Sequence, residues 1–336
     1  MNRRIFTKAI LAACVCLGAL PTWADQPIVI KFSHVVAPDT PKGKAAERFK
    51  QLAEERTKGR VKVEVYPNSQ LYKDKEELEA LQLGSVQMLA PSLAKFGPLG
   101  VKEFEVFDLP FIFKDQAAFR AVTDGPVGAG LLRKLEPKGI TGLVYLDNGF
   151  HIMSANKPLH HVADFKGLKM RIQSSKVLEA QMRALGALPQ VMAFSELYQA
   201  LQSGVVDGTE GVPSNFWTQK IYEVQKHITL SNHGHLAYAV IVNKPFWDGL
   251  PADIRTTLEG AMRDAAKYSN EIAASDNTSA LEKIKASGKT TIYTPTAEEI
   301  NEWKKALMPV HKEMEGRVGK DIIQAVYKAT GFVAPK

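Results

Sequence analysis

The sequence has only two cysteines, Cys14 and Cys16, and both lie within its first 24 residues. The 312 residues that follow therefore cannot form a disulfide or use a thiolate as nucleophile or metal ligand. They also contain no apolar run that approaches the roughly 20 residues of a membrane-spanning helix. A chain of this length without disulfides depends on hydrophobic cores for its stability, and its length favours two lobes over one.

Sequence motifs of common enzyme classes are missing as well. There is no G-x-S-x-G elbow, no H-E-x-x-H, no Walker A motif and no G-x-G-x-x-G after a predicted strand. Glu196, Asp207 and Glu210 could serve general acid–base chemistry. Acidic residues at the first turn of a helix, or in a turn next to a strand, more often cap the helix or form ion pairs. We therefore predict that the protein is not an enzyme and needs no cofactor, with a hydrolase or lyase as the less favoured alternative.

Two pairs of histidines, His160 with His161 and His233 with His235, raise the question of a metal site. His233 and His235 are expected to share one face of a strand. A zinc site needs three or four protein ligands, and a complete set is not evident in either segment. We therefore expect these histidines to have structural or hydrogen-bonding roles, and we predict no metal site.

The charge pattern argues against a nucleic-acid partner. The formal net charge is +7, and it is +4 without the three cations Arg3, Arg4 and Lys8. The remaining basic residues are interspersed with acids and form no basic stripe. A mildly positive surface still favours the approach of small anions.

The first 24 residues have the pattern of an export signal. Three basic residues precede the apolar run AILAACVCLGAL and the segment PTWA, so we expect cleavage after Ala24 and a mature chain that starts at Asp25 outside the cytoplasm. NRRIFTK also resembles a twin-arginine signal. LAAC resembles a lipoprotein box that would anchor Cys14, but the apolar VCLGAL that follows argues against it.

Strand and helix patterns alternate along the first two thirds of the chain, which predicts two α/β lobes with largely parallel sheets and a cleft between them. The last third is mostly helical, and one long helix over 251–288 is expected to bridge the lobes, as one or two segments. We assign residues 25–148 and about 233–260 to lobe 1, and 149–232 and about 275–336 to lobe 2. The predicted strands are 27–36, 61–67, 86–92, 104–113, 140–149, 150–156, 164–172, 188–193 and 205–211, and the other predicted helices are 41–59, 74–85, 115–139, 175–186, 194–204, 296–314 and 319–331.

The strand that contains GLKMRIQSS carries an arginine where an α/β sheet would bind a ligand. Leu168, Met170 and Ile172 alternate as on an apolar strand face, and Arg171 stands near the carboxyl end of that strand. The planar guanidinium offers five N–H donors that match the two oxygens of a carboxylate. An exposed arginine that tethers a neighbouring acid is the ordinary alternative. We predict an anion site at Arg171.

Eight segments in order resemble the periplasmic solute-binding proteins of TRAP transporters, and especially the C4-dicarboxylate-binding subgroup. The resemblance runs from about residue 27 to beyond 310. The segments are KFSHVVAPDTPKGKAAERF, VEVYPNSQL, APSLAKF, NGFHIMSANKP, KGLKMRI, MAFSELYQALQSGVVDGTEG, SNFWTQKIYEVQ and NHGHLAYAVIVNKPFWDGLP.

The resemblance implies a two-lobe receptor that closes over a small organic acid and delivers it to membrane permease subunits. Malate, succinate or fumarate is the expected ligand, and a strand arginine is expected to pair with its carboxylate. The residues expected to bind the ligand are Arg171, Ser92, His34, Asn215, His151, Lys42, Phe194, Ser174 and Tyr238.

Two positions depart from what relatives commonly carry. His151 stands where a Lys or Arg is common, which makes that contact weaker or pH-dependent because imidazole titrates near pH 6.5. Gly211 replaces an Asn and removes a side-chain donor. Both changes leave open a monocarboxylate such as a 2-oxo acid, an aromatic acid or a sugar acid. A sensory partner that reads the ligand-bound state is a further alternative.

Overall fold

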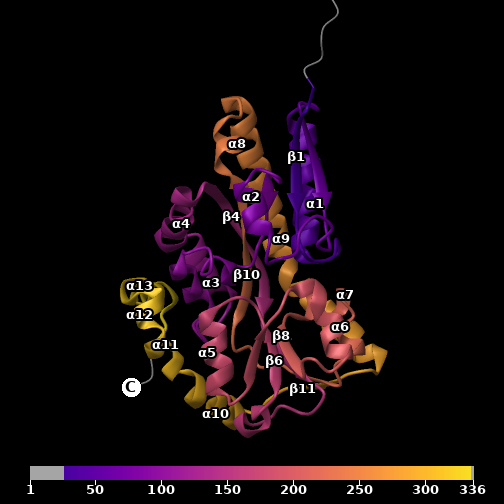
Figure 1. Ribbon diagram of the computed structural model, residues 1–336, viewed down its shortest axis with the longest axis vertical. Coiled ribbons are helices and arrows are strands. Elements are labelled where there is room, and N and C mark those ends of the chain that lie inside the picture. The colour runs from indigo at the N-terminus through magenta and orange to yellow at the C-terminus, as the bar shows by residue number, and fades with distance from the viewer. Residues whose placement is uncertain (1–25, 334–336) are drawn as a thin grey trace, which may run out of the picture.

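The computed structural model describes residues 26–333, which fold into two lobes that each contain one β-sheet (Figure 1). The predicted export signal lies outside the described residues. Within residues 26–333, no helix has both the length and the apolar character needed to cross a membrane.

Lobe 1, the upper lobe in Figure 1, is built on a five-stranded sheet with the order β2-β1-β3-β10-β4. β1 is parallel to β2 and β3, whereas β10 is antiparallel to β3 and β4. The strands are β1 (Ile28–Ser33), β2 (Val61–Tyr66), β3 (Met88–Leu89), β4 (Ile140–Phe150) and β10 (His235–Asn243). The helices are α1 (Pro41–Arg56), α2 (Glu77–Gln82), η1 (Leu93–Lys95), η2 (Lys102–Asp108), α3 (Gln116–Thr123), α4 (Pro126–Arg133), η3 (Glu136–Lys138) and α8 (Lys244–Asp248).

Lobe 2, the lower lobe in Figure 1, has a six-stranded sheet with the order β11-β9-β5-β8-β6-β7. β6 is parallel to β7 and β8, and β5 is antiparallel to β8 and β9. The strands are β5 (Ile152–Ala155), β6 (Lys169–Ile172), β7 (Leu188–Val191), β8 (Gly208–Gly211), β9 (His227–Thr229) and β11 (Thr291–Tyr293). The helices are η4 (Val162–Phe165), α5 (Lys176–Ala184), η5 (Phe194–Glu196), α6 (Leu197–Gln202), α7 (Pro213–Thr218), η6 (Ile221–Glu223) and α10 (Ala297–Leu307).

The start of α1 shows how local sequence places a polar side chain inside lobe 1. Thr40 caps the helix because its hydroxyl accepts a hydrogen bond from the N–H of Gly43, and Pro41 occupies the first helical position. Ala45, Ala46, Phe49 and Leu52 then form a buried face. Lys42 lies in this first turn and is buried.

The long helix α9 (Ala252–Ser287) is one continuous helix of 36 residues that contacts both lobes. It packs against α1 and β4 of lobe 1 and against α7 of lobe 2. Asn270 accepts a hydrogen bond from the N–H of Asp147, and Asn277 accepts one from the N–H of Ser214. The helix is therefore a single segment with contacts to both lobes.

The C-terminal helices return from lobe 2 to lobe 1. They are α11 (Pro309–Glu313), α12 (Glu315–Val318) and α13 (Lys320–Thr330). Val310, Val318 and Val326 pack into the core of lobe 1, and Arg317 donates to the carboxylate of Glu105 at 2.5 and 2.8 Å. These residues were expected in lobe 2, but their apolar face packs on lobe 1.

The predicted α/β fold with paired lobes is confirmed, but both sheets are mixed rather than largely parallel, and several local predictions are wrong. Residues 104–113, expected as a strand, form part of η2 and a loop. Buried aromatic residues give this segment an apolar run, which cannot by itself distinguish a strand from other buried structure. The single helix expected over 115–139 is divided into α3, α4 and η3, because Gly125 and Pro126 start a new helix.

Candidate functional site

Arg171 occupies the face of β6 opposite to the core of lobe 2. Met170 and Ile172 pack into that core, so the strand alternation directs Arg171 to the other face. Its side chain is only 3% exposed, and Nε and Nη2 both donate to the carbonyl oxygen of Met192, at 3.1 and 2.9 Å. Burial lowers the pKa of Arg171, against the effect of Asp74 and Glu210, and the group remains a cation. The backbone contact uses two of its five N–H groups and orients the rest.

Asp74 of lobe 1 faces Arg171 across the boundary between the lobes. Its Oδ2 lies 4.0 Å from Nη2 of Arg171 and 3.0 Å from Nζ of Lys95, and its Oδ1 accepts the N–H of Phe194 at 3.1 Å. Burial opposes ionisation of Asp74, but Lys95 and Arg171 hold the pKa of this carboxyl below its usual value. Asp74 therefore holds lobe 1 against lobe 2 next to the guanidinium.

Lys42 and Tyr238 form the lobe 1 side of the site. Nζ of Lys42 donates to the carbonyl oxygen of Ala90 at 3.0 Å and lies 3.8 Å from the centre of the Tyr238 ring. The Tyr238 hydroxyl accepts from Nδ2 of Asn148 at 2.8 Å, and Asn215 lies near it. Burial lowers the pKa of Lys42 to about 7, and burial raises the pKa of Tyr238 to about 12. Lys42 therefore titrates near neutral pH.

His34 is a buried, neutral imidazole next to Lys42. Burial and the charge of Lys42 lower the pKa of His34 to about 3. Neither ring nitrogen has a hydrogen-bond partner among residues 26–333. A buried polar atom without a partner is costly, so a neutral N–H at this place suits a ligand oxygen.

Ser92 connects the Lys42 side of the site to the end of β6. Its hydroxyl donates to Oε1 of Gln173 in lobe 2, and its backbone forms a β-bridge with Tyr238. Ser174, the next residue after Gln173, is partly exposed, and its side chain makes no hydrogen bond within the described chain. Gln173, and not the predicted Ser174, therefore makes the contact between the lobes.

His151 lies in a second buried cluster with Glu210 and His233. Nδ1 of His151 and Nε2 of His233 lie 3.3 and 3.4 Å from Oε2 of Glu210, and Ser231 hydrogen-bonds to Nδ1 of His233 at 2.7 Å. Burial alone would raise the pKa of Glu210, but the two histidines hold it well below its usual range. Burial lowers the pKa of His233. Potential metal-ligand atoms of the three residues lie within 4.8 Å of one another, a grouping that no single sequence segment contained.

The other acids and histidines of the sequence analysis have structural contacts. Glu196 pairs with Lys73 at 2.9 Å, and Asp207 accepts the N–H of Lys169 at 2.8 Å. The expectation that His233 and His235 share one strand face is wrong, since β10 begins only at His235. His235 lies 3.2 Å from Asp147, His160 stacks on Tyr293, and His161 pairs with Glu302.

Two groups of contacts contain most of the predicted ligand-binding residues. In the first, Arg171 faces Asp74, which pairs with Lys95, and Phe194 flanks the guanidinium with its ring centre 5.7 Å from Cζ. In the second, Lys42 lies over Tyr238, and Ser92 bridges to Tyr238 and hydrogen-bonds to Gln173 of lobe 2. His34 and Asn215 lie near this second group, whereas His151 and Ser174 lie outside both groups.

Sequence reasoning missed four side chains of these two groups: Asp74, Lys95, Gln173 and Asn148. Gln173 could have been found, because it follows Arg171 at the end of the same strand. Asp74 is the first residue of the helix predicted over 74–85, where an ordinary capping acid is expected. Its position next to Arg171 depends on how the two lobes meet, which no local pattern encodes.

Comparison with known proteins identifies the family of this chain. Residues 32–317 match the family described as bacterial extracellular solute-binding protein, family 7. The chain is 65% identical to the C4-dicarboxylate-binding periplasmic protein DctP of Rhodobacter capsulatus, over 98% of this chain and 99% of that protein.

Two solved structures are similar to the fold over nearly its whole length. A TRAP periplasmic solute-binding protein from Shewanella oneidensis, with bound succinate, has a TM-score of 0.88 at 45% identity and covers 90% of this chain and 99% of its own. One from Pseudomonas aeruginosa, with bound L-malate, has a TM-score of 0.83 at 47% identity and covers 85% of this chain and 100% of its own.

Proposed function

Because this chain belongs to the bacterial extracellular solute-binding proteins of family 7, we propose that it is the periplasmic receptor of a TRAP-type transporter and binds a C4-dicarboxylate. The observation that carries the proposal is the buried guanidinium of Arg171. Two of its N–H groups hold the Met192 carbonyl, and the remaining ones face lobe 1. That arrangement suits one carboxylate of the ligand, bound through two parallel hydrogen bonds.

The second carboxylate is assigned to Lys42 and His34 of lobe 1 together with Asn215, which lies on α7 of lobe 2. All three side chains are buried; Lys42 lies over the Tyr238 ring and near His34, and Asn215 lies near the Tyr238 hydroxyl. Lys42, Lys95 and Arg171 are buried with the acids Asp74, Glu77 and Glu210, so the site offers a ligand carboxylate several cationic donors within one buried region. His151 acts indirectly, by holding Glu210 as a carboxylate.

Ligand binding is coupled to closure of the lobes. The contacts from Ser92 to Gln173 and from Asp74 to the N–H of Phe194 join lobe 1 to lobe 2 in this structure. Closure removes water from Arg171, which strengthens its attraction to a carboxylate in the low-dielectric interior. The closed receptor then delivers its ligand to the permease subunits.

The export of the protein follows from the same proposal. The N-terminal signal is removed after Ala24, and Asp25 begins the mature chain, with either the general secretory or the twin-arginine route. Intact mass spectrometry of the periplasmic protein tests this start.

A ligand panel distinguishes dicarboxylates from monocarboxylates. At 100 times its dissociation constant, a ligand stabilises the folded state by about 2.7 kcal/mol. We expect succinate, malate or fumarate to raise the melting temperature accordingly, with smaller shifts for pyruvate, benzoate and gluconate. A larger shift with any monocarboxylate would contradict the dicarboxylate assignment, and turnover of a bound acid would favour an enzyme instead.

Dicarboxylate affinity is expected to fall as the pH rises through about 7. The pKa of Lys42 is lowered to about 7 by burial, so the free site loses this cation above that pH and must take up a proton to bind a dianion. One linked proton changes the affinity by up to about tenfold per pH unit. Calorimetry between pH 7 and 9 should show this slope in the wild type, and Lys42→Met should flatten it. A slope that persists in Lys42→Met would assign the titration to another group.

A further inference from the structure

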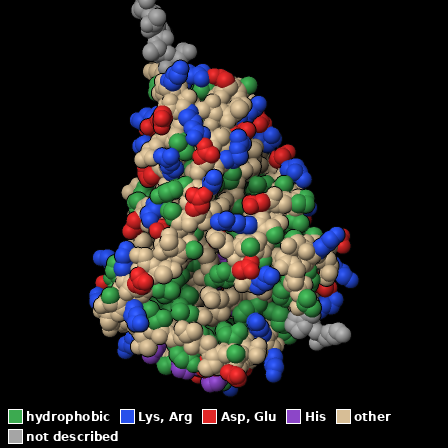
Figure 2. Space-filling view, turned by 180° about the vertical axis from the view of Figure 1, so that it is seen from behind, with side chains coloured by type: hydrophobic (Ala, Val, Ile, Leu, Met, Phe, Trp, Pro, Cys, Tyr) green, Lys and Arg blue, Asp and Glu red, His purple; other side chains and the backbone are tan. Residues whose placement is uncertain are grey.

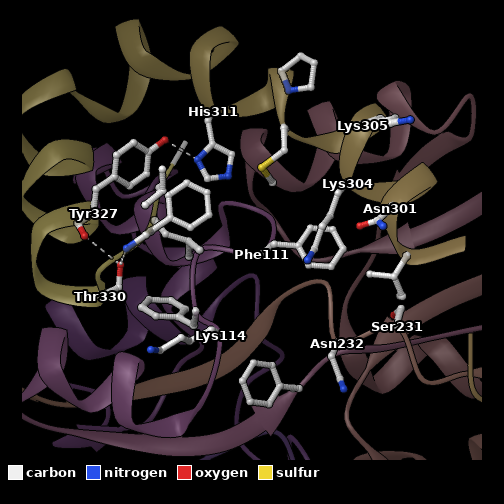
Figure 3. Close-up of a pocket in the computed structure, with 18 of the residues that line it drawn as sticks. Phe111, Lys114, Ser231, Asn232, Asn301, Lys304, Lys305, His311, Tyr327 and Thr330 are labelled. Atoms are coloured by element: carbon white, nitrogen blue, oxygen red, sulfur yellow. Dashed lines mark hydrogen bonds between the residues drawn. The ribbon is translucent and has the colours of Figure 1, made fainter. Parts of the chain in front are cut away.

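A large groove on the molecule is separate from the contacts around Arg171. It has a volume of about 1390 Å³, and its walls come from the loop after η2, from the segments that connect the two sheets, and from α10, α11 and α13 (Figure 3). In the view from behind, hydrophobic side chains gather in the lower, wider part of the molecule, beside the end of the described chain (Figure 2). The hydrophobic residues that line the groove include Phe111, Phe113, Phe150, Leu230, Met308 and Phe332.

Aromatic rings and unpaired lysines together define the chemistry of this groove. His311, Tyr327 and Phe332 form a stacked wall, with ring centres of His311 and Phe332 5.2 Å apart. Lys304 lies with Nζ 5.4 Å from the centre of the Phe111 ring (Figure 3). Lys114, Lys304 and Lys305 are exposed and have no carboxylate within 4.0 Å among the residues that the structure describes. Glu315, which also lines the groove, is paired with Lys312.

One groove residue, Phe111, has a strained backbone. Its φ is 56°, in the left-handed region that a bulky residue rarely adopts, whereas Asn232, with φ of 46°, is of a type that adopts this region more readily. The N–H of Phe111 donates to the carbonyl of His233 at 2.8 Å, which ties the two segments together. Such strain is concentrated at ligand clamps and switches, and here it presents the Phe111 ring beneath Lys304.

From these features we propose that the groove is a second binding site, for an organic anion with a flat apolar body. The aromatic walls receive the body, and the ammonium groups of Lys114, Lys304 and Lys305 receive the anionic head. The charge of the site selects the class of ligand, since its unpaired groups are all cations. A carboxylate or a sulfonate meets this requirement.

Occupancy of the groove is linked to lobe closure. Phe150 and Asn232 line the groove, whereas the next residues, His151 and His233, face Glu210, so each connecting segment has one side towards the groove and one towards the Glu210 cluster. The groove walls come from both lobes, so a movement that separates the lobes at Arg171 also changes the spacing of those walls. An anion that binds the groove in its present shape therefore favours the present arrangement of the lobes. This coupling rests on the proposed dicarboxylate function, whereas the binding site itself does not.

Fluorescence titration with 8-anilinonaphthalene-1-sulfonate tests the site on the full mature chain. We expect one saturable site, with affinity lowered about tenfold in the triple variant Lys114→Ala, Lys304→Ala, Lys305→Ala. The matched control Lys102→Ala, Lys166→Ala, Lys285→Ala removes the same charge from other exposed positions and should bind as the wild type does. Equal loss in both triple variants, or no saturable binding, would overturn the site.

The same probe tests the coupling. Saturating succinate should tighten probe binding about fivefold or more, and saturating probe should tighten succinate binding by the same factor, because linkage is reciprocal. Displacement of the probe by succinate would place it in the cleft at Arg171 and overturn the proposal. Independent affinities would overturn the coupling. Succinate binding by the groove triple variant is measured in parallel, so a failure of the groove is distinguished from a failure of the receptor function.

Discussion

Arg171→Gln should reduce succinate affinity by at least about 100-fold. The substitution removes a buried cation whose two charge-assisted hydrogen bonds to a carboxylate contribute roughly 1.5 to 3 kcal/mol each. Calorimetric titration at pH 7 measures the loss. Arg171→Lys keeps the charge but not the planar fork, so we expect it to bind more weakly than the wild type and more tightly than Arg171→Gln.

Arg183→Gln is the matched control for this prediction. Arg183 is also an arginine of lobe 2, but its side chain is about half exposed and pairs with Glu179 on the surface of α5. Its loss should leave succinate affinity unchanged. Melting curves without ligand establish that each variant is folded. A folded Arg171→Gln protein with wild-type affinity would remove Arg171 from the site.

Asp74→Asn should lower the free energy of unfolding of the ligand-free protein by about 3 kcal/mol. Removing one partner of a buried charge network leaves the other charges uncompensated, which typically costs 3–5 kcal/mol. After the substitution, Lys95 still pairs with Glu77. Arg171 has no other carboxylate within 4.0 Å among residues 26–333. The difference in urea midpoint between the variant and the wild type, multiplied by the m-value, gives the change in the free energy of unfolding.

Glu196→Gln provides the comparison for Asp74→Asn. Glu196 also contacts a lobe 1 cation, Lys73, but both side chains are nearly half exposed. Exposed ion pairs contribute only about 0–1 kcal/mol, so this variant should lie close to the wild type. The stabilisation from Asp74 should be complete above its unfolded pKa near 4 and should decline as the pH falls through its lower folded pKa. Equal midpoints for the two variants would mean that Asp74 does not hold the lobes.

The central strand of the site could be predicted from sequence because its evidence is local. Met170 and Ile172 alternate around Arg171, and the strand lies before a serine that caps α5, so both the element and the direction of the arginine followed from one segment. Lys42 lies on a helix that is also predicted, whereas β10, which carries Tyr238, is absent from the predicted strands. Both residues were expected at the ligand only because of the family resemblance, and their mutual contact was not expected.

The parts that could not be predicted depend on contacts between distant segments. His151, Glu210 and His233 come from three separate segments around β5, β8 and β10, so no spacing in the sequence reveals their cluster. The return of α11 to α13 to lobe 1 has the same cause, since an amphipathic helix does not specify which core receives it. Asp74 likewise acquires its role only when the lobes meet.

A crystal structure of the protein with succinate tests the central claim most directly. The proposal predicts one carboxylate of succinate about 2.7–3.1 Å from the guanidinium of Arg171, with the Met192 carbonyl still bound and the other carboxylate near Lys42 and His34. Succinate bound elsewhere, with Arg171 neutralised only by Asp74, would contradict it.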